Sequence, residues 1–576
     1  MATTVEILLA ALPLLVAGVL LVGLLWPATR AMPIAWITAL IIGFFIWEMP
    51  VNWLAAASIN GVITALNILW IVFGALLLLY MLQEAGAFDR INRGFATVSD
   101  DRRVQIVLIG FFLATFIEGA AGFGTPAAVV APLMLGLGFP ALAAVIAGII
   151  GHIIAVTYGA VGTPIIIGIQ NPMQVFEADI AAGGFTVVEF SEQVAAWAAT
   201  YHALVGFVMP FIAVLMVVHF FGEDDNGSWG PALEVAPLCL FAGISFAIPY
   251  WLSAWFFTAE FPSLIGSMVG GAITISVLRA GYLLPDSHWE FPPREEWPDH
   301  WVGTIQPGGT ESVDEGMEEI SLARAWAPYA VLVVLLVITR AVGPISSAIG
   351  NADYGVQIGN FTIGIVLAWA DILGTDISGS LAWMSVPGFW LIVSALVAIP
   401  IYQMTSTEVK SAFAEAGRKL VSPFIALIFV IAMVQVMLQS GNPPGVELEG
   451  MIIVLAQTTA GILGPVYPFV AALIGALGAA MAGSNTVSNI TFSGFQFEAA
   501  GELGLPRQII VGAQAVGGAI GNLVAIHNLV AALATVGLVG QEGRVMRLNL
   551  LPLLYYSFMV GILAMLFSYV LFPGLF

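Results

Sequence analysis

The chain has 576 residues, of which 60% are hydrophobic and 9% are charged, and its formal net charge at pH 7 is −21. Soluble domains are about half apolar and about a quarter charged, so this composition excludes a soluble enzyme, a fibre and a disordered chain. It indicates a polytopic membrane protein. The acidic balance also excludes nucleic acid as a partner.

The acidic excess is concentrated in the polar segments, and Lys410 and Lys419 are the only lysines. Dissolved salt screens the self-repulsion of such a surface. We therefore predict a prokaryotic, halophilic source, specifically a halophilic archaeon, with the chain in the plasma membrane.

Apolar stretches long enough for a membrane helix, which needs about 20 residues, recur along the whole chain. Their continuous character excludes the alternating pattern of a β-barrel. We predict an all-α fold with about 12–15 transmembrane helices. The stretches are 5–26, 33–48, 62–84, 103–117, 140–158, 198–221, 231–255, 262–284, 324–344, 356–374, 386–403, 420–440, 449–482, 508–537 and 550–575.

The longest polar stretch, 285–323, holds ten acidic residues and a single basic one, Arg294. It divides the chain into an N-terminal half, 1–284, and a C-terminal half, 324–576. Such a stretch is expected to be a solvated linker, with a loop that docks a partner as the alternative.

One segment of each half resembles the other. Residues 118–164 and 482–528 both open with a cluster of small residues, reach a Leu-Gly-Phe-Pro or Leu-Gly-Leu-Pro turn and continue into a Gly-interrupted apolar helix. Pro140 and Pro506 are 366 residues apart, as are Gly151 and Gly517. We expect two repeat cores, at about 103–165 and about 449–537. Chance similarity between Gly-rich membrane segments is the alternative.

The charges that flank these segments indicate that the repeats are inverted. Along the chain, Arg102 and Arg103 precede the first segment, and the stretch 170–197, which has no Lys or Arg, follows it. The second segment is instead followed by Arg544 and Arg547. Basic residues mark the cytoplasmic side. Inverted repeats with broken or re-entrant helices are typical of alternating-access carriers.

The small-residue clusters interrupt both segments where an unbroken helix in contact with lipid would be expected. Broken backbone at membrane depth is stable only when it is buried in protein or lines a polar cavity, and helix N-termini there suit a small carboxylate. The alternative is close helix packing through small residues. The predicted substrate-binding residues are Gly122, Gly124, Thr125, Ser484, Asn485, Thr486, Ser488 and Asn489.

Ionisable residues within apolar helices are costly to bury and are functional candidates by default. Glu118 directly precedes the first cluster and is predicted to take up a proton with the substrate. The alternative is that it is an interfacial cap or the partner of a buried donor. His152 and His527 are candidate proton relays, with a packing role as the alternative. Glu260 is a weaker candidate, because Pro262 marks a helix start where an acid is favourable anyway.

No sequence element points to an enzyme. The chain has no phosphate-binding Walker loop, HExxH, CxxC pair or GxSxG element, and neither His152 nor His527 has a metal-ligating neighbour at i+3 or i+4. We therefore expect no ATP hydrolysis, no metal and no cofactor.

Several motifs resemble those of the lactate permease family, which are proton-coupled carriers of lactate and glycolate within the ion transporter superfamily. They are FIEGAAGFGTPAA (116–128), GLGFPALAA (136–144), AVTYGAVGTPI (155–165), EFP (260–262), RAWAPY (324–329), GSNTVSN (483–489) and ATVGLVGQE (534–542). The resemblance spans most of the chain. It implies a secondary carrier for small 2-hydroxy monocarboxylates.

The chain departs from this family pattern at two positions. Asn485 stands where the family usually has an aspartate, and Asn522 stands where it usually has a lysine. Because an acid and a base are both replaced by neutral amides, the resemblance implies that the two residues form a pair in relatives. Asn522 therefore joins the candidate site residues.

Together these features predict a permease that takes up L-lactate, D-lactate and glycolate by proton symport. A sodium-coupled organic-anion carrier is the first alternative, and a membrane sensor that binds carboxylate without transporting it is the second. The expected partners are the monocarboxylate, the coupling cation and the bilayer, and a homo-oligomer remains open.

Overall fold

A computed structural model of the chain describes residues 3–24, 26–122, 124–222, 229–305, 320–351, 354–538 and 540–576. Within these ranges, 13 helical segments are long and apolar enough to cross a membrane. The predicted helical membrane fold with about 12–15 spans is therefore confirmed. Of the predicted polar loop, residues 306–319 lie outside the described part of the chain.

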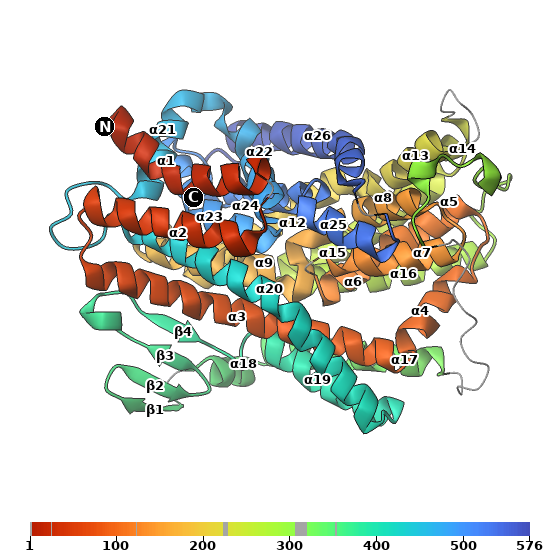
Figure 1. Cartoon of the computed structure of the whole chain (residues 1–576), viewed down its shortest axis with the longest axis horizontal. Coiled ribbons are helices and arrows are strands. Elements are labelled where there is room, and N and C mark those ends of the chain that lie inside the picture. The colour runs from red at the N-terminus through yellow and green to blue at the C-terminus, as the bar shows by residue number, and fades with distance from the viewer. Residues whose placement is uncertain are drawn as a thin grey trace.

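In the described part of the first half, all regular secondary structure is helical (Figure 1). Its helices are α1 (Thr4–Gly18), α2 (Ala28–Phe45), α3 (Val51–Glu84), α4 (Ala87–Ala96), α5 (Arg102–Gln105), α6 (Ala114–Ala120), α7 (Thr125–Gly136), α8 (Ala141–Gly151), α9 (Gly159–Ile166), α10 (Gln170–Met173), α11 (Glu177–Ala182), α12 (Val187–Val205), α13 (Met209–Phe221), α14 (Gly230–Glu234), α15 (Ala236–Phe256) and α16 (Pro262–Arg279).

In the described part of the second half, the structure has ten α-helices, with a small sheet between α18 and α19. Its helices are α17 (Leu322–Ala341), α18 (Gly343–Gly350), α19 (Pro387–Tyr402), α20 (Ser406–Gln439), α21 (Met451–Leu463), α22 (Tyr467–Ala482), α23 (Asn485–Glu502), α24 (Arg507–Ile520), α25 (Ile526–Thr535) and α26 (Glu542–Leu566). Its strands are β1 (Gly355–Ile358), β2 (Phe361–Gly364), β3 (Leu367–Trp369) and β4 (Gly379–Leu381).

The prediction of a membrane helix at 356–374 is wrong, because this segment forms strands β1 to β3. The four strands are antiparallel in the order β1-β2-β3-β4. Ile358 pairs with Phe361 across the two-residue turn Gly359–Asn360, and Gly359 has a φ of 60°. A Gly-containing two-residue turn between a β-branched and an aromatic residue favours a hairpin over a helix, so this local signal overrides the apolar composition.

The predicted apolar stretch 449–482 is two helices rather than one. α21 ends at Leu463, and Gly464 has a φ of 51°, which a helix does not accommodate. After the short turn Gly464–Val466, α22 begins at Tyr467. The chain therefore changes direction before it reaches the second small-residue cluster.

The longest helices pack across the two halves of the chain. α3 lies along α20 and α19, and α24 packs against α12, α22 and α23 (Figure 1). Gly61 allows the close approach of α3 to α20, since a Cβ atom there would lie 2.4 Å from Ala432 Cα. Small residues at such crossings are the usual means by which membrane helices pack tightly.

The turns before α8 and α24 have the same geometry. Phe139 N donates to Met134 O at 3.1 Å, and Leu505 N donates to Ala500 O at 2.8 Å. The preceding glycines, Gly138 and Gly504, have φ values of 100° and 63°. Both are helix C-caps in which a glycine ends one helix and the next begins after a proline.

Candidate functional site

Both small-residue clusters are breaks between helices. α6 ends at Ala120 and α7 begins at Thr125, and Gly122 and Gly124 have φ values of 60° and 76°. In the second half, Gly483 has a φ of 63° and separates α22 from α23. Left-handed backbone favours glycine at these three positions, because a side chain would clash there.

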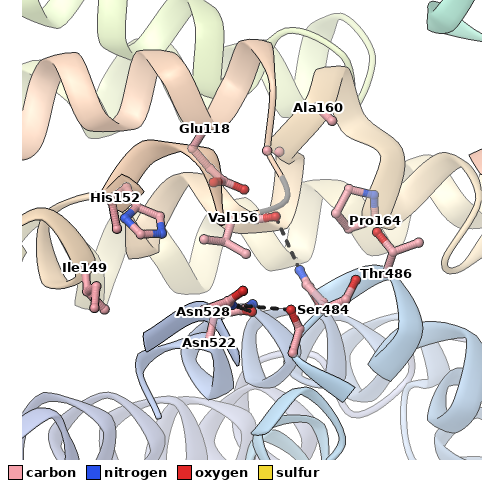
Figure 2. Close-up of a pocket in the computed structure, with 16 residues that line it drawn as sticks. Glu118, Ile149, His152, Val156, Ala160, Pro164, Ser484, Thr486, Asn522 and Asn528 are labelled. Atoms are coloured by element: carbon pink, nitrogen blue, oxygen red, sulfur yellow. Dashed lines mark hydrogen bonds between the residues drawn. The ribbon is translucent and has the colours of Figure 1, made fainter. Parts of the chain in front are cut away.

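A small cavity lies between the two breaks, with first-half residues on one side and second-half residues on the other (Figure 2). The described residues that line it are Glu118, Gly122, Gly124, Ala127, Ile149, His152, Val156, Gly159, Ala160, Pro164, Gly483, Ser484, Asn485, Thr486, Asn522 and Asn528. We call it the central cavity.

The structure brings together eight of the predicted site residues at this cavity: Glu118, Gly122, Gly124, His152, Ser484, Asn485, Thr486 and Asn522. Thr125, Ser488 and Asn489 lie on the same helices but do not line it. Glu260 lies elsewhere, and the side chain of His527 falls outside the described part of the chain.

Glu118 is on α6 and is 4% exposed. Its carboxyl group lies over Gly159, where an added Cβ atom would come within 2.2 Å of Oε1. Among the described residues that line the central cavity, Glu118 is the only acid, and none is Lys or Arg. A negative charge in this cavity is therefore not neutralised by a described lining residue.

His152 faces the same cavity from the end of α8 (Figure 2). Its Nδ1 lies 2.6 Å from Gly148 O. Because a carbonyl oxygen can only accept, Nδ1 carries a proton, and Nε2 is the ring nitrogen available to the cavity. In the neutral ring, Nε2 is an acceptor.

Three asparagines form the second-half wall. Asn522 Oδ1 accepts a hydrogen bond from Asn528 Nδ2 at 2.8 Å, and Asn528 Nδ2 also lies 3.3 Å from Gly483 O. Asn485 Nδ2 lies 3.5 Å from Val156 O, which connects α23 to the first half. These bonds hold the broken backbone of both halves around one space.

Asn528 is a site residue that sequence reasoning missed. It follows His527 directly in the sequence. Asn528 Oδ1 lies 3.0 Å from the position of an added Cβ at Gly124, so a side chain at Gly124 would displace it. A polar amide within the apolar stretch 508–537 was the signal that could have identified it.

Two helix N-termini begin at the central cavity, those of α7 at Thr125 and of α23 at Asn485. Ser484 caps α23 by accepting from Val487 N at 3.4 Å. The first amide groups of a helix have no acceptor within it and carry the positive end of its dipole. Thr486 in the first turn of α23 also lines the cavity. This arrangement suits an anion.

The cavity is narrow, with a volume of about 40 Å³. A cavity needs a volume of at least about 10–15 Å³ to hold one water molecule. The space therefore holds about three waters, or one small organic molecule of similar bulk.

The remaining predicted binding residues have structural contacts instead. Thr125 Oγ1 donates to Gly122 O at 2.7 Å and supports the first break. Ser488 Oγ donates to Gly475 O at 2.7 Å, and Asn489 Nδ2 donates to Pro164 O at 3.0 Å. The two α23 residues lie one turn beyond Asn485, and their contacts fix α23 against α22 and α9.

Glu260 belongs to a different cavity and forms an ion pair. Its Oε1 lies 2.6 Å from Arg340 Nε, and its other carboxyl oxygen accepts from the Thr258 hydroxyl. No group of three or more His, Cys, Asp or Glu side chains suited to a metal occurs in the described ranges.

The family model described as L-lactate permease matches residues 6–571 of the chain. The chain is similar to the glycolate permease GlcA of Escherichia coli K12, at 28% identity over 575 residues that cover 98% of this chain and 96% of the relative. It is similar to the L-lactate permease of the same strain at 28% identity, covering 88% and 85%. The L-lactate permease of Bacillus subtilis is 26% identical, covering 92% and 90%.

Proposed function

The chain belongs to the L-lactate permease family, and on this premise we propose that it takes up L-lactate, D-lactate and glycolate across the plasma membrane by proton symport. The relatives named as lactate and glycolate permeases support this substrate class. The membrane-spanning fold and the central cavity between two helix breaks support a secondary carrier.

The charge of the central cavity is the observation that supports a proton as the coupling ion. Glu118 is the only acid among the described lining residues, and no Lys or Arg accompanies it. A carboxylate substrate beside an ionised Glu118 would place two negative charges in one small space, which is strongly unfavourable away from bulk water. Protonation of Glu118 removes the conflict, so one proton accompanies each anion.

The neutral groups around the cavity provide the contacts that a 2-hydroxy acid needs. In this proposal, the first backbone amides of α7 and α23 and the Thr486 hydroxyl bind the carboxylate of the substrate. The hydroxyl group of the substrate donates a hydrogen bond to Asn528 Oδ1 or to His152 Nε2. Thr486, His152 and Asn528 all line the cavity, which supports these assignments.

We further propose that the chain is organised as two inverted repeats, with cores at about 103–165 and 449–537 on either side of the polar loop 285–323. The matching turns at Gly138 and Gly504, and the helix break that precedes each turn, support a repeat. The carrier would alternate between two arrangements around the fixed central cavity.

Two other functions compete with this proposal. A sodium-coupled organic-anion carrier would use the same cavity with a different cation. A membrane sensor would bind the carboxylate without accumulating it. Membership of a permease family favours transport over sensing.

The relatives quoted are bacterial. The halophilic archaeal source therefore remains a prediction that rests on the charge of the polar segments alone. The homo-oligomer also remains a prediction.

Uptake in cells that lack their own lactate carriers tests the substrate class. Labelled L-lactate should accumulate, and unlabelled D-lactate and glycolate should compete with it, whereas a dicarboxylate should not. Saturable lactate binding to the purified protein without any accumulation would support the sensor instead.

A further inference from the structure

A second cavity of about 410 Å³ lies beside the central one and is lined by both polar and apolar residues. Its lining includes Asn67 of α3, Gln170 of α10, Glu192 of α12, and Glu260 with Arg340 and Ser385. We call it the vestibule. Among its described lining residues, Arg340 is the only Lys or Arg.

The vestibule lies toward the end of the molecule that is poor in basic residues. Arg340 lies in the last turn of α17, directly before α18. Figure 1 shows the sheet toward one end of the molecule, α18 next to the sheet, and α4, α5 and α14 at the opposite end. The predicted cytoplasmic arginines Arg102 and Arg103 belong to α5 at that opposite end. Gln170 and Glu192 of the vestibule belong to the segment 170–197, which has no Lys or Arg, so the vestibule lies on the side of the predicted outer face.

Two contacts hold Arg340 in place and leave one of its guanidinium nitrogens without a partner among the described residues. Its side chain is 15% exposed, its Nε contacts Glu260 Oε1 at 2.6 Å, and its Nη2 donates to Ser385 O at 2.5 Å. Nη1 makes no hydrogen bond to any described residue. Since a guanidinium group can bind a carboxylate through two parallel hydrogen bonds, Glu260 occupies only part of this binding capacity.

The wall between the two cavities is one short segment of α9. Gly159, Ala160 and Pro164 line the central cavity, whereas the next residues, 165–167, line the vestibule. Ala160 and Val161 have φ values of 43° and 55°, and a branched side chain such as that of Val161 is rare in this region. Strained backbone of this kind is typical of parts that rearrange.

Glu260 touches this wall through its own backbone. An added Cβ atom at Gly162 would lie 2.5 Å from Ala259 O and 3.0 Å from Glu260 N. The segment that contains Glu260 therefore packs directly on the left-handed turn of α9.

We propose that Arg340 is an access subsite for the substrate carboxylate, which displaces Glu260 from the guanidinium before the substrate passes the turn at 160–162 into the central cavity. The inference rests on the proposed function. The net charge of −21 repels an anion. A guanidinium group with one nitrogen free of any described partner attracts the carboxylate at the point of access, although Glu192 and Glu260 share the same lining.

Three variants separate this role from a structural one. R340Q removes the subsite and leaves Glu260 unpaired, E260Q leaves Arg340 free, and the double variant R340Q/E260Q removes both charges. If Arg340 merely neutralises Glu260, the double variant should recover normal uptake. If Arg340 receives the substrate, the double variant should remain defective while E260Q does not.

The measurement is the concentration dependence of labelled lactate uptake by cells that lack other lactate carriers. We expect KM to rise about tenfold or more in R340Q and in the double variant, which corresponds to about 1.4 kcal/mol, with the maximal rate largely retained. E260Q should keep or lower KM. R324Q is the matched control, since Arg324 near the start of the same helix donates to a backbone carbonyl, Ile401 O, and its KM should not change.

Recovery of the wild-type KM in R340Q/E260Q would overturn the subsite. Lactate binding to the purified wild-type and R340Q proteins, followed by tryptophan fluorescence, separates the two proposals. Weaker binding in R340Q without any uptake by the wild type would overturn the proposed function but retain the subsite. Normal uptake by R340Q with the KM of the wild type would overturn the subsite but retain the proposed function.

Discussion

The carboxyl group of Glu118 lies directly over the α-carbon of Gly159, so that a Cβ atom added at Gly159 would come within 2.2 Å of Glu118 Oε1. This contact joins α6 to the start of α9 at the central cavity. It places a buried carboxyl beside the turn that separates the central cavity from the vestibule. A change in the charge or position of Glu118 would therefore affect both the substrate space and its wall.

Replacement of Glu118 by glutamine should abolish the accumulation of lactate driven by a pH gradient and leave lactate exchange measurable. Glutamine has a similar shape but cannot bind or release the proton. The measurement compares pH-driven uptake with counterflow in proteoliposomes. E177Q removes an exposed carboxyl on α11 and should behave as wild type. Unchanged pH dependence in E118Q would remove Glu118 from the mechanism.

Replacement of Gly159 by alanine should reduce lactate uptake by about tenfold or more while the protein still folds. Gly159 has a φ of −62°, which alanine adopts readily, so the new methyl group acts mainly by displacing the Glu118 carboxyl. A misplacement of about 1 Å at a reacting group costs up to about 100-fold in rate.

The matched control for this variant is G417A on α20, where an added Cβ would meet nothing within 4 Å. Its uptake should be unchanged. Both variants should elute as folded protein with similar thermal midpoints. Full uptake by a folded G159A protein would show that the position of the Glu118 carboxyl is unimportant.

The pair Asn485 and Asn522 allows a test of charge balance in the central cavity. N485D adds a second carboxyl to a cavity whose described lining has no cation, so lactate uptake should fall by about tenfold or more. N485D/N522K supplies the opposite charge and should recover much of the uptake. If N485D and the double variant were equally impaired, the two positions would not be electrostatically coupled.

A different prediction concerns stability at the predicted cytoplasmic end. Glu234 accepts hydrogen bonds from Ser287 N at 2.8 Å and Ser287 Oγ at 2.5 Å, and it pairs with Arg103 Nη1 at 2.9 Å. The Ser287 bonds first, and Arg103 second, lower the pKa of Glu234 to about 2. Because its pKa is lower in the folded state, the ionised Glu234 stabilises the fold above its ordinary pKa of 4.5, and this contribution is lost as pH falls toward 2.

E234Q should accordingly lower the thermal midpoint at pH 7, by an amount that corresponds to about 1 kcal/mol. The difference from wild type should narrow as pH is lowered below about 4.5. The exposed Glu295 provides a control, E295Q, that should have no effect. A difference that stays constant from pH 7 to the acid limit would contradict the role of the ionised carboxylate.

The sequence was most informative where small residues interrupt apolar runs. Gly122, Gly124 and Gly483 predict broken helices because left-handed backbone favours glycine, and the structure has its breaks there. Which residues of α23 face the cavity was not predictable from the cluster alone. Ser488 and Asn489 are small polar residues like Asn485 and Thr486, but their side chains contact α22 and α9. The rotation of a helix about its axis is fixed by packing between segments that are far apart in the chain.

Contacts between distant segments also account for the other omissions. Gly159 matters because of Glu118, and Arg340 because of Glu260, and no local pattern connects either pair. The sheet at 355–381 was missed for a different reason, since the apolar composition of 356–374 outweighed the Gly359–Asn360 hairpin signal. The hairpin has a local sequence signal from which it can be predicted, whereas the long-range pairs have none.

In the proposed mechanism, a proton accompanies each carboxylate through the cavity that contains Glu118. The most direct test of this mechanism is uptake of labelled L-lactate into proteoliposomes of the purified protein, under an inward pH gradient alone and under an inward sodium gradient alone. We expect accumulation above equilibrium with the pH gradient, loss of that accumulation in E118Q, and no accumulation with the sodium gradient. Accumulation driven by sodium but not by protons would rule out proton symport through Glu118.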